Sequence, residues 1–217
     1  MNKLRVLVAD DHEIARRGVC SLLRQQGWEV VGEAADGRDA VAKAKLLRPD
    51  VSVIDVSMPE LNGLDATRQI LKDNSESKVL ILTMHRSDSL MSDALDAGAR
   101  GYLLKSDSCR DLALAVESIS ANRSYFTSDM NELILDGYIS RKSARSENRS
   151  DDTRLTLRQR EILQLLAEGK TSRGVAVSLG LSIKTVETHR ANIMRRLKCH
   201  SVSELVRYAV RNHVVQA

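Results

Sequence analysis

The chain has 217 residues, of which 42% are hydrophobic, with 33 Lys/Arg against 29 Asp/Glu. This length suggests one or two domains with true hydrophobic cores. No apolar run approaches the roughly 20 residues that a transmembrane helix needs. The N-terminus does not look like a signal peptide, because acidic residues directly follow a short apolar run. We therefore expect a cytoplasmic protein with no membrane association.

Positive charge is concentrated in the C-terminal part of the chain. Residues 1–123 carry 17 Lys/Arg and 19 Asp/Glu, a balance of −2, whereas residues 154–217 carry 12 and 4, a balance of +8. This asymmetry predicts a polyanion partner for the C-terminal part alone.

The three cysteines are far apart and lack metal-ligand spacing, so we expect reduced thiols in ordinary helices at Cys20, Cys109 and Cys199.

Apolar strands and amphipathic helices alternate along the first 120 residues. Strands are predicted at residues 4–9, 28–31, 51–54, 79–82 and 101–104. Each is followed by a helix, whose apolar positions span residues 14–23, 40–47, 64–71, 90–95 and 112–119, with Ser87 and Ser108 as N-caps of the last two. Five alternations at this spacing predict a five-stranded, doubly wound parallel sheet with helices on both faces.

Polar residues stand where four of these strands end. They are Asp10, Asp11, Asp55, Thr83 and Lys105. Right-handed crossovers would gather these strand ends at one edge of the sheet. Carboxylates gathered there repel one another unless a hard cation lies between them, and Mg²⁺ accepts one or two carboxylates together with water and phosphate oxygens.

A phosphoryl-acceptor site follows from this set of groups. Asp55 can act as a nucleophile towards phosphorus. Thr83 can donate a hydrogen bond to one phosphoryl oxygen and Lys105 can place a positive charge at another. No obvious base for fast hydrolysis accompanies them. Taken singly, Asp10 and Asp11 could instead cap the first helix and Lys105 could be a surface lysine, but their joint placement favours the site.

The C-terminal part predicts a helix-turn-helix domain after a linker. One more helix is predicted over residues 128–140, and residues 141–154 contain no apolar residue except Ala144, which indicates a flexible linker. A second domain of four helices begins near Leu155. Their N-caps are predicted at Thr156, Thr171, Ser182 and Ser201, with capping-box partners Gln159 and Glu204 for the first and last. A tight glycine turn at Gly180 joins the middle pair.

The helix predicted over residues 182–197 has two distinct faces. Val186, Ile193 and Leu197 share an apolar face, and small, polar and basic residues lie opposite. Such a face suits the DNA major groove. We expect bases to be read by Lys184, Glu187, Thr188 and Ala191, and phosphates to be contacted by Thr185, Arg190, Arg195 and Lys170. An ordinary solvated helix face is the alternative.

Residues 4–120 resemble the receiver domain of two-component response regulators. The resemblance lies in Val-Ala-Asp-Asp-His at 8–12, Ile-Asp-Val-Ser-Met-Pro at 54–59, Leu-Thr-Met at 82–84 and Gly-Tyr-Leu-Leu-Lys at 101–105. It implies a flavodoxin-like strand order 2-1-3-4-5 and phosphorylation of Asp55 by a histidine kinase. It also implies Mg²⁺ bound by Asp10, Asp11, Asp55 and the backbone carbonyl of Ser57, and a switch pair of Thr83 and Tyr102. Ser57 and His85 flank the site and would tune the lifetime of the phosphoryl group; ordinary loop residues are the alternative for both. Ser106 stands where many receivers have proline.

Residues 155–212 resemble the DNA-binding domain of the NarL/FixJ, or LuxR-type, regulators. Leu-Thr-Leu-Arg-Gln-Arg-Glu at 155–161, Ala-Glu-Gly-Lys at 167–170 and Ser-Ile-Lys-Thr-Val-Glu-Thr-His at 182–189 carry this similarity. The chain departs from the family pattern at Leu157, where proline is common, and at Gly174-Val175, where Glu-Ile is common. The two resemblances place a receiver domain at residues 1–123, an extra helix and linker at 124–154, and the DNA-binding domain at 155–217.

Together these features predict a phosphorylation-controlled transcription factor and not an enzyme. We expect the unphosphorylated receiver to cover the helix at 182–197, and phosphorylated Asp55 to favour its release and dimerisation on paired half-sites, with the helix at 201–213 in the dimer contact. A phosphatase with an aspartyl-phosphate intermediate is one alternative, but Ser57 stands where its acid/base aspartate would be. A DNA-binding protein with a vestigial receiver and a protein-binding adaptor are the others.

Overall fold

The computed structural model describes residues 3–84, 87–107, 109–126 and 155–215. These residues form two compact units, one built on a β-sheet and the other entirely helical. The helix predicted at 128–140 and the linker predicted at 141–154 lie outside the described residues, as do His85 and Ser108.

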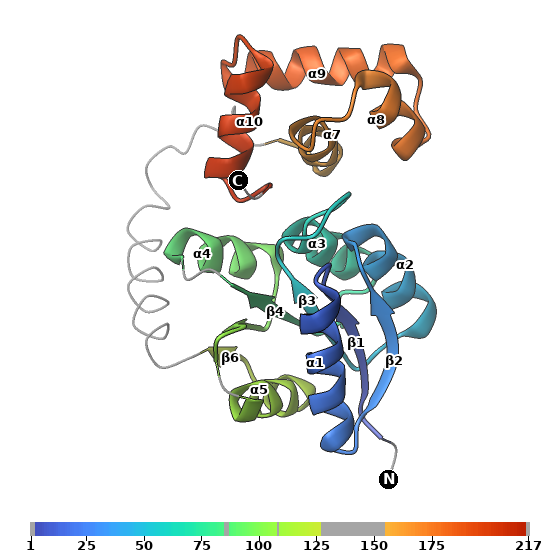
Figure 1. Ribbon diagram of the computed structural model, residues 1–217, viewed down its shortest axis with the longest axis vertical. Helices are drawn as coiled ribbons and strands as arrows, with labels where there is room; N and C mark the ends of the chain where they lie inside the picture. Colours follow the sequence, from blue (N-terminus) through green and yellow to red (C-terminus); the bar gives the residue numbers. More distant parts are fainter. Residues whose placement is uncertain (1–2, 85–86, 108, 127–154, 216–217) are drawn as a thin grey trace. The chain divides into compact units, whose positions relative to one another are not determined.

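The first unit is a parallel sheet whose first five strands alternate with helices along the chain (Figure 1). The strands are β1 (Arg5–Ala9), β2 (Glu29–Ala34), β3 (Val51–Asp55), β4 (Val79–Thr83), β5 (Gly101–Leu104) and β6 (Tyr125–Phe126). The helices are α1 (Glu13–Gln25), α2 (Gly37–Leu47), α3 (Gly63–Asp73), α4 (Asp88–Ala97) and α5 (Cys109–Ser120). The strands lie in the order β2-β1-β3-β4-β5-β6, and every neighbouring pair is parallel.

This arrangement confirms the doubly wound sheet and the order of its first five strands. The predicted number of strands was wrong, because β6 adds a sixth strand beside β5, where Tyr125 and Phe126 pair with Gly101 and Tyr102. Two residues are too few to show the alternation of apolar and polar positions that marks a strand in a sequence.

Alternate residues of the strands enter separate cores on the two faces of the sheet. In β1, Leu7 and Ala9 pack with α2, α3 and α4, whereas Val6 and Val8 pack with α1 and α5. All residues of β3 and β4 are buried. Burial on both faces explains why the central strands are continuously apolar in the sequence, and it fixes the backbone at the points where these strands end.

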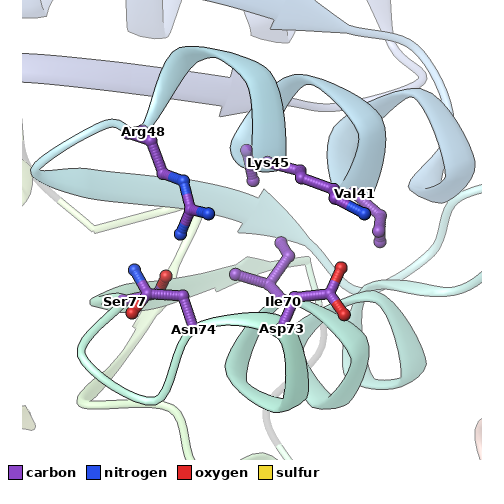
Figure 2. Close-up of a pocket in the computed structure, with 8 residues that line it drawn as sticks. Val41, Lys45, Arg48, Ile70, Asp73, Asn74 and Ser77 are labelled. Atoms are coloured by element: carbon purple, nitrogen blue, oxygen red, sulfur yellow. The ribbon is translucent and has the colours of Figure 1, made fainter.

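A small pocket between α2 and α3 lies away from those strand ends (Figure 2). It is lined by Val41, Ala44, Lys45, Arg48, Ile70, Asp73, Asn74 and Ser77. Both helices end here and lead into the starts of β3 and β4. Because Asp55 stands at the opposite end of β3, this pocket is not part of the candidate site.

The second unit consists of α7 (Leu157–Ala167), α8 (Ser172–Leu179), α9 (Ile183–Leu197) and α10 (Val202–Arg211) around one apolar core. Arg158 fastens α7 to the end of α8, because its guanidinium pairs with Glu161 at 2.6 Å and donates to the Leu179 carbonyl at 2.9 Å. Gly180, with φ of 62°, makes the turn between α8 and α9. The all-helical fold with a helix-turn-helix is confirmed.

The helix caps of this unit follow the sequence with one exception. Thr156 and Gln159 form the predicted reciprocal capping box, at 3.2 Å and 3.0 Å. Ser201 caps α10 by accepting from the Glu204 amide at 3.2 Å. The Glu204 carboxylate, however, accepts from the His200 amide at 2.8 Å, one residue before the position expected of a capping box. None of the described helices is long and apolar enough to cross a membrane.

The three cysteines are free thiols in different settings. Cys20 is buried in α1, Cys109 is exposed at the start of α5, and Cys199 is half-buried. Cys199 follows the end of α9, so the expectation of a helical position was wrong for this residue. Burial raises the pKa of the Cys20 thiol to about 11, and nearby Glu33 adds to this shift.

We expect Cys109 to react with Ellman's reagent at about pH 8 and Cys20 to stay unmodified until the protein unfolds, because the thiolate is the reactive form. Mass spectrometry of the peptides after a brief labelling would locate the modified thiols. Labelling of Cys20 at the rate of Cys109 in the native protein would contradict the burial of α1 against the sheet.

Candidate functional site

The ends of three strands bring two carboxylates and one ammonium together. Asp10 follows β1, Asp55 ends β3 and Lys105 follows β5. The Lys105 ammonium lies 2.8 Å from Asp10 Oδ2 and 3.2 Å from Asp55 Oδ2, and the three side chains are 8%, 2% and 3% exposed. The parallel order of the strands thus converts three positions that are distant in the chain into one buried charged cluster.

This cluster keeps an excess of negative charge. Asp10 Oδ2 and Asp55 Oδ2 pair with Lys105 through charge, but neither oxygen makes a well-directed hydrogen bond within the described residues. Burial raises the pKa of the Asp55 carboxyl to about 6; Lys105 opposes this shift, and Asp10 and Asp11 add to it. Since the charged form of Asp55 is destabilised, an added cation would be favoured here.

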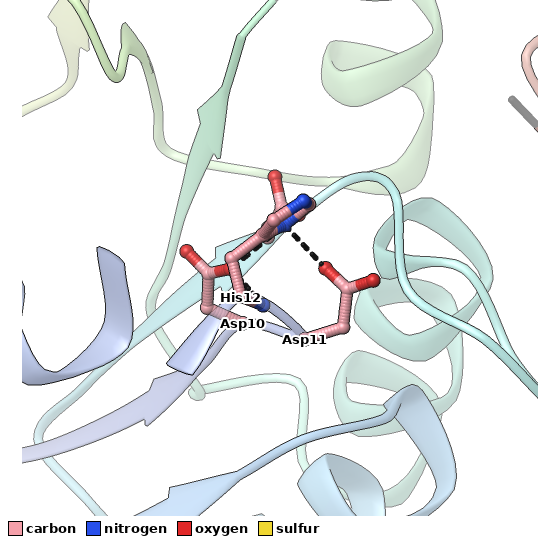
Figure 3. A group of neighbouring side chains, drawn as sticks. Asp10, Asp11 and His12 are labelled. Atoms are coloured by element: carbon pink, nitrogen blue, oxygen red, sulfur yellow. Dashed lines mark hydrogen bonds and ion pairs between the residues drawn. The ribbon is translucent and has the colours of Figure 1, made fainter. Parts of the chain in front are cut away.

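Asp11 and His12 form the exposed rim of the cluster. His12 donates its backbone N–H to Asp10 Oδ1 at 2.9 Å, and its Nδ1 atom lies 2.9 Å from Asp11 Oδ1 (Figure 3). His12 is also the N-cap residue of α1, although its side chain makes no cap hydrogen bond. Asp10 and Asp11 therefore do not cap α1 with their side chains, which removes the structural alternative considered for them.

The donor atoms of this cluster fit a divalent cation. Asp10, Asp11, His12 and Asp55 each offer one ligand atom, and these atoms lie within 4.8 Å of one another. Opposite ligands of an octahedral Mg²⁺ are about 4.2 Å apart, so small side-chain movements would place the carboxylate oxygens in one coordination shell. Half-buried Ser57, the remaining predicted ligand, stands two residues after β3 ends.

Thr83 and Tyr102 form a buried contact beside the cluster. Thr83 ends β4, Tyr102 lies in β5, and each is 1% exposed. Burial raises the pKa of the Tyr102 hydroxyl to about 12, although hydrogen bonds with the Ser87 backbone and the Thr83 side chain lower it. The Thr83 carbonyl also accepts from the Lys105 amide at 2.7 Å. Thr83 is thus linked to the lysine through its backbone and to the tyrosine through its side chain.

Two residues that support the cluster were missed in the sequence. A Cβ atom at Gly63 would lie 2.0 Å from the Asp55 carbonyl oxygen, so the approach of α3 to β3 requires glycine. Arg16 donates to the Asp10 carbonyl at 2.7 Å. In the sequence, Gly63 is only recognisable as the start of a helix, and Arg16 resembles several other arginines that are expected at the surface. Neither has a periodicity or motif that would reveal its partner.

The residues predicted to contact DNA gather on the exposed side of α9. Val186 and Ile193 are fully buried on its inner side. The exposed residues of the set are Lys184, Glu187, Thr188, Ala191 and Arg195, and the half-buried ones are Thr185, Arg190 and Lys170. Lys170 lies outside α9, in the loop between α7 and α8. The two-faced character of α9 is therefore as predicted.

We expect Gly63→Ala to lower the free energy of unfolding of the first unit by about 2 kcal/mol, because the added methyl group would collide with backbone atoms of Asp55. Gly18→Ala is the matched control, since a Cβ there meets no atom within 4 Å; it should raise stability by about 0.5–1 kcal/mol. Urea unfolding followed by fluorescence of Trp28, the single tryptophan, measures both. Equal stability of the two variants would contradict the contact.

Comparisons with known proteins agree with both units. Residues 6–117 match the response regulator receiver domain, and residues 153–209 match the LuxR family of bacterial regulatory proteins. The transcriptional regulatory protein LiaR of Bacillus subtilis is 38% identical, and the response regulator protein VraR of Staphylococcus aureus is 39% identical; each alignment covers 98% of this chain and 99% of the relative.

Solved structures are also similar over nearly the full length of the chain. RcsB of Salmonella typhimurium has a TM-score of 0.56 at 27% identity, covering 97% of this chain and 100% of that one. A structure of two RcsB dimers bound to two parallel DNAs has a TM-score of 0.58 at 26% identity, covering 97% and 99%. The chain therefore belongs to the response regulators that join a receiver domain to a LuxR-type helix-turn-helix, and it is a transcription regulator under phosphorylation control.

Proposed function

We propose that Asp55 accepts the phosphoryl group, from a phosphohistidine of a sensor histidine kinase. The observation that supports this best is the burial of the Asp55 carboxylate beside one ammonium, at the strand edge that also carries Thr83. An oxygen of Asp55 forms the new bond to phosphorus. The phosphorus–nitrogen bond of the donor breaks, and the donor imidazole keeps the electron pair and takes up a proton.

The neighbouring residues would bind and orient the phosphoryl group. Lys105 would exchange part of its pairing with Asp10 and Asp55 for a phosphoryl oxygen, and Thr83 would donate its hydroxyl to another. Asp10, Asp11, Asp55 and the Ser57 carbonyl would hold Mg²⁺, which when bound neutralises charge on the phosphoryl oxygens. Ser57 and His85 would influence access of water to the acyl phosphate.

Thr83 and Tyr102 would report the phosphorylation. A phosphoryl group adds nearly two negative charges, and these would draw the Thr83 hydroxyl away from Tyr102. The side chain of Tyr102 is already buried. The change would therefore begin with the loss of the Thr83–Tyr102 hydrogen bond and would reach α4 through the backbone of Ser87, the N-cap residue of that helix.

The second unit would place α9 in the major groove of DNA. Its exposed face supports contacts to bases by Lys184, Glu187, Thr188 and Ala191, and to phosphates by Thr185, Arg190, Arg195 and Lys170. Glu187 would accept from a cytosine amino group. In this proposal the receiver spans residues 1–123 and the DNA-binding domain residues 155–217, and the chain acts in the cytoplasm.

Phosphorylation would favour release of α9 and formation of a homodimer. A dimer would bind two half-sites of an operator, and α10 would contribute part of the contact between the two copies. The solved structure of two RcsB dimers bound to two parallel DNAs supports a dimer as the DNA-binding form.

Asp55→Ala is expected to abolish labelling by a radioactive small phosphodonor in the presence of Mg²⁺, because the nucleophile is removed. Asp73→Ala is the control, since this exposed aspartate lines the pocket at the far end of the strands. Undiminished labelling of Asp55→Ala would refute the assignment.

Lys184→Ala and Thr188→Ala are expected to weaken DNA binding about tenfold each, as is typical when a base contact is lost. Labelling by the phosphodonor should remain at the wild-type level. Lys72→Ala is the control, because it removes an exposed lysine from the first unit. Titrations with operator DNA at fixed salt measure the affinities, and wild-type affinity of both α9 variants would refute the proposed contact surface.

A further inference from the structure

His12 brings a nitrogen donor to a site whose other donors are oxygens. Its Nδ1 atom lies 2.9 Å from Asp11 Oδ1 and 3.6 Å from Asp10 Oδ1 (Figure 3). The ring is thus directed over the two carboxylates that lie at the amino end of α1. It is not required as a helix cap, because the His12 side chain makes no cap hydrogen bond.

These distances match the spacing of ligands around one metal ion. Two neighbouring ligands at about 2.1 Å from a metal are about 3.0 Å apart in an octahedral site and about 3.4 Å apart in a tetrahedral one. The Nδ1 atom of His12 meets the first value with Asp11 and is close to the second with Asp10. Asp55 lies within the same 4.8 Å group of ligand atoms.

Little has to be broken for a metal to enter between these groups. The side chains of His12 and Asp11 are 63% and 31% exposed, so the contact between them competes with water and contributes little to stability. Behind them, Asp10 and Asp55 are almost fully buried, and two of their oxygens make no well-directed hydrogen bond within the described residues. The cost of opening the rim is small, and the buried charge behind it favours a cation.

We propose that His12 Nδ1 is a metal ligand, and that the site therefore binds divalent transition metals such as Co²⁺ or Ni²⁺ more tightly than Mg²⁺. This inference rests on the proposed Mg²⁺ site and concerns its selectivity. Imidazole suits Co²⁺, Ni²⁺, Cu²⁺ and Zn²⁺, whereas Mg²⁺ takes oxygen ligands almost exclusively. His12 then contributes to the affinity for the first group of ions and little to the affinity for Mg²⁺.

The test compares the full-length chain with His12→Ala and His200→Ala. His200 is the matched control, because it is an exposed histidine of the second unit. Co²⁺ affinity is measured by equilibrium dialysis, and Mg²⁺ affinity by its ability to displace Co²⁺. His12→Ala should bind Co²⁺ at least about tenfold more weakly, since even groups that only orient a ligand contribute that much. Its Mg²⁺ affinity, and both affinities of His200→Ala, should be unchanged.

NMR of the imidazole resonances provides a second readout that does not depend on affinity. Substoichiometric Co²⁺ should shift and broaden the imidazole signals of His12 more strongly than those of any other histidine, and these signals are missing from the spectrum of His12→Ala. Wild-type Co²⁺ affinity in His12→Ala, or broadening of another histidine alone, would overturn the role of His12. Failure of Mg²⁺ in large excess to displace Co²⁺ from His12→Ala, which lacks the nitrogen ligand, would instead refute the proposed Mg²⁺ site, and the selectivity inferred for it would fall as well.

Discussion

Two buried carboxylates that share one ammonium are the constraint on which the first unit depends. Asp10 and Asp55 lie at the ends of neighbouring strands, and Lys105 reaches both from β5. Burying like charges together is unfavourable, and one lysine compensates only part of it. The sheet maintains this arrangement because β3 and β4 are buried along their whole length. The remaining negative charge favours binding of a cation at this edge of the sheet. A bound cation would in turn attract the negatively charged oxygens of a phosphoryl group.

This cluster could be predicted from the sequence because it depends on the order and direction of the strands. A parallel sheet brings strand ends to one edge, so Asp10, Asp55 and Lys105 could be grouped without knowing any side-chain position. What could not be predicted were contacts set by local packing angles. The approach of Gly63 to the Asp55 carbonyl depends on how α3 meets β3, and the position of His12 depends on how α1 begins. β6 escaped prediction because two residues carry no periodic pattern.

The helical unit was predictable for a different reason. Its helix boundaries are set by caps that act over three residues, such as Thr156 with Gln159, and local patterns are readable in a sequence. Glu204 is the exception: its carboxylate accepts from the His200 amide and not from the Ser201 amide that a capping box would use. Local patterns therefore do not always identify the exact hydrogen-bond donor. The faces of α9 also follow from its period alone. Which base each exposed side chain meets depends on the operator, and neither the sequence nor the fold contains that partner.

In the proposed mechanism, the Thr83–Tyr102 hydrogen bond is the first contact through which phosphorylation of Asp55 would affect DNA binding by the second unit. Tyr102 is 1% exposed, so its hydroxyl cannot exchange a lost partner for water without moving. A buried hydroxyl left without a partner costs about 1–3 kcal/mol. If a phosphoryl group takes the Thr83 hydroxyl, Tyr102 either keeps the Ser87 backbone as its remaining partner or shifts its ring. A shift of the ring would break the contact with Ser87, the N-cap residue of α4. In the proposed mechanism, burial of one tyrosine would thus turn a change in charge at Asp55 into a change in the position of a helix.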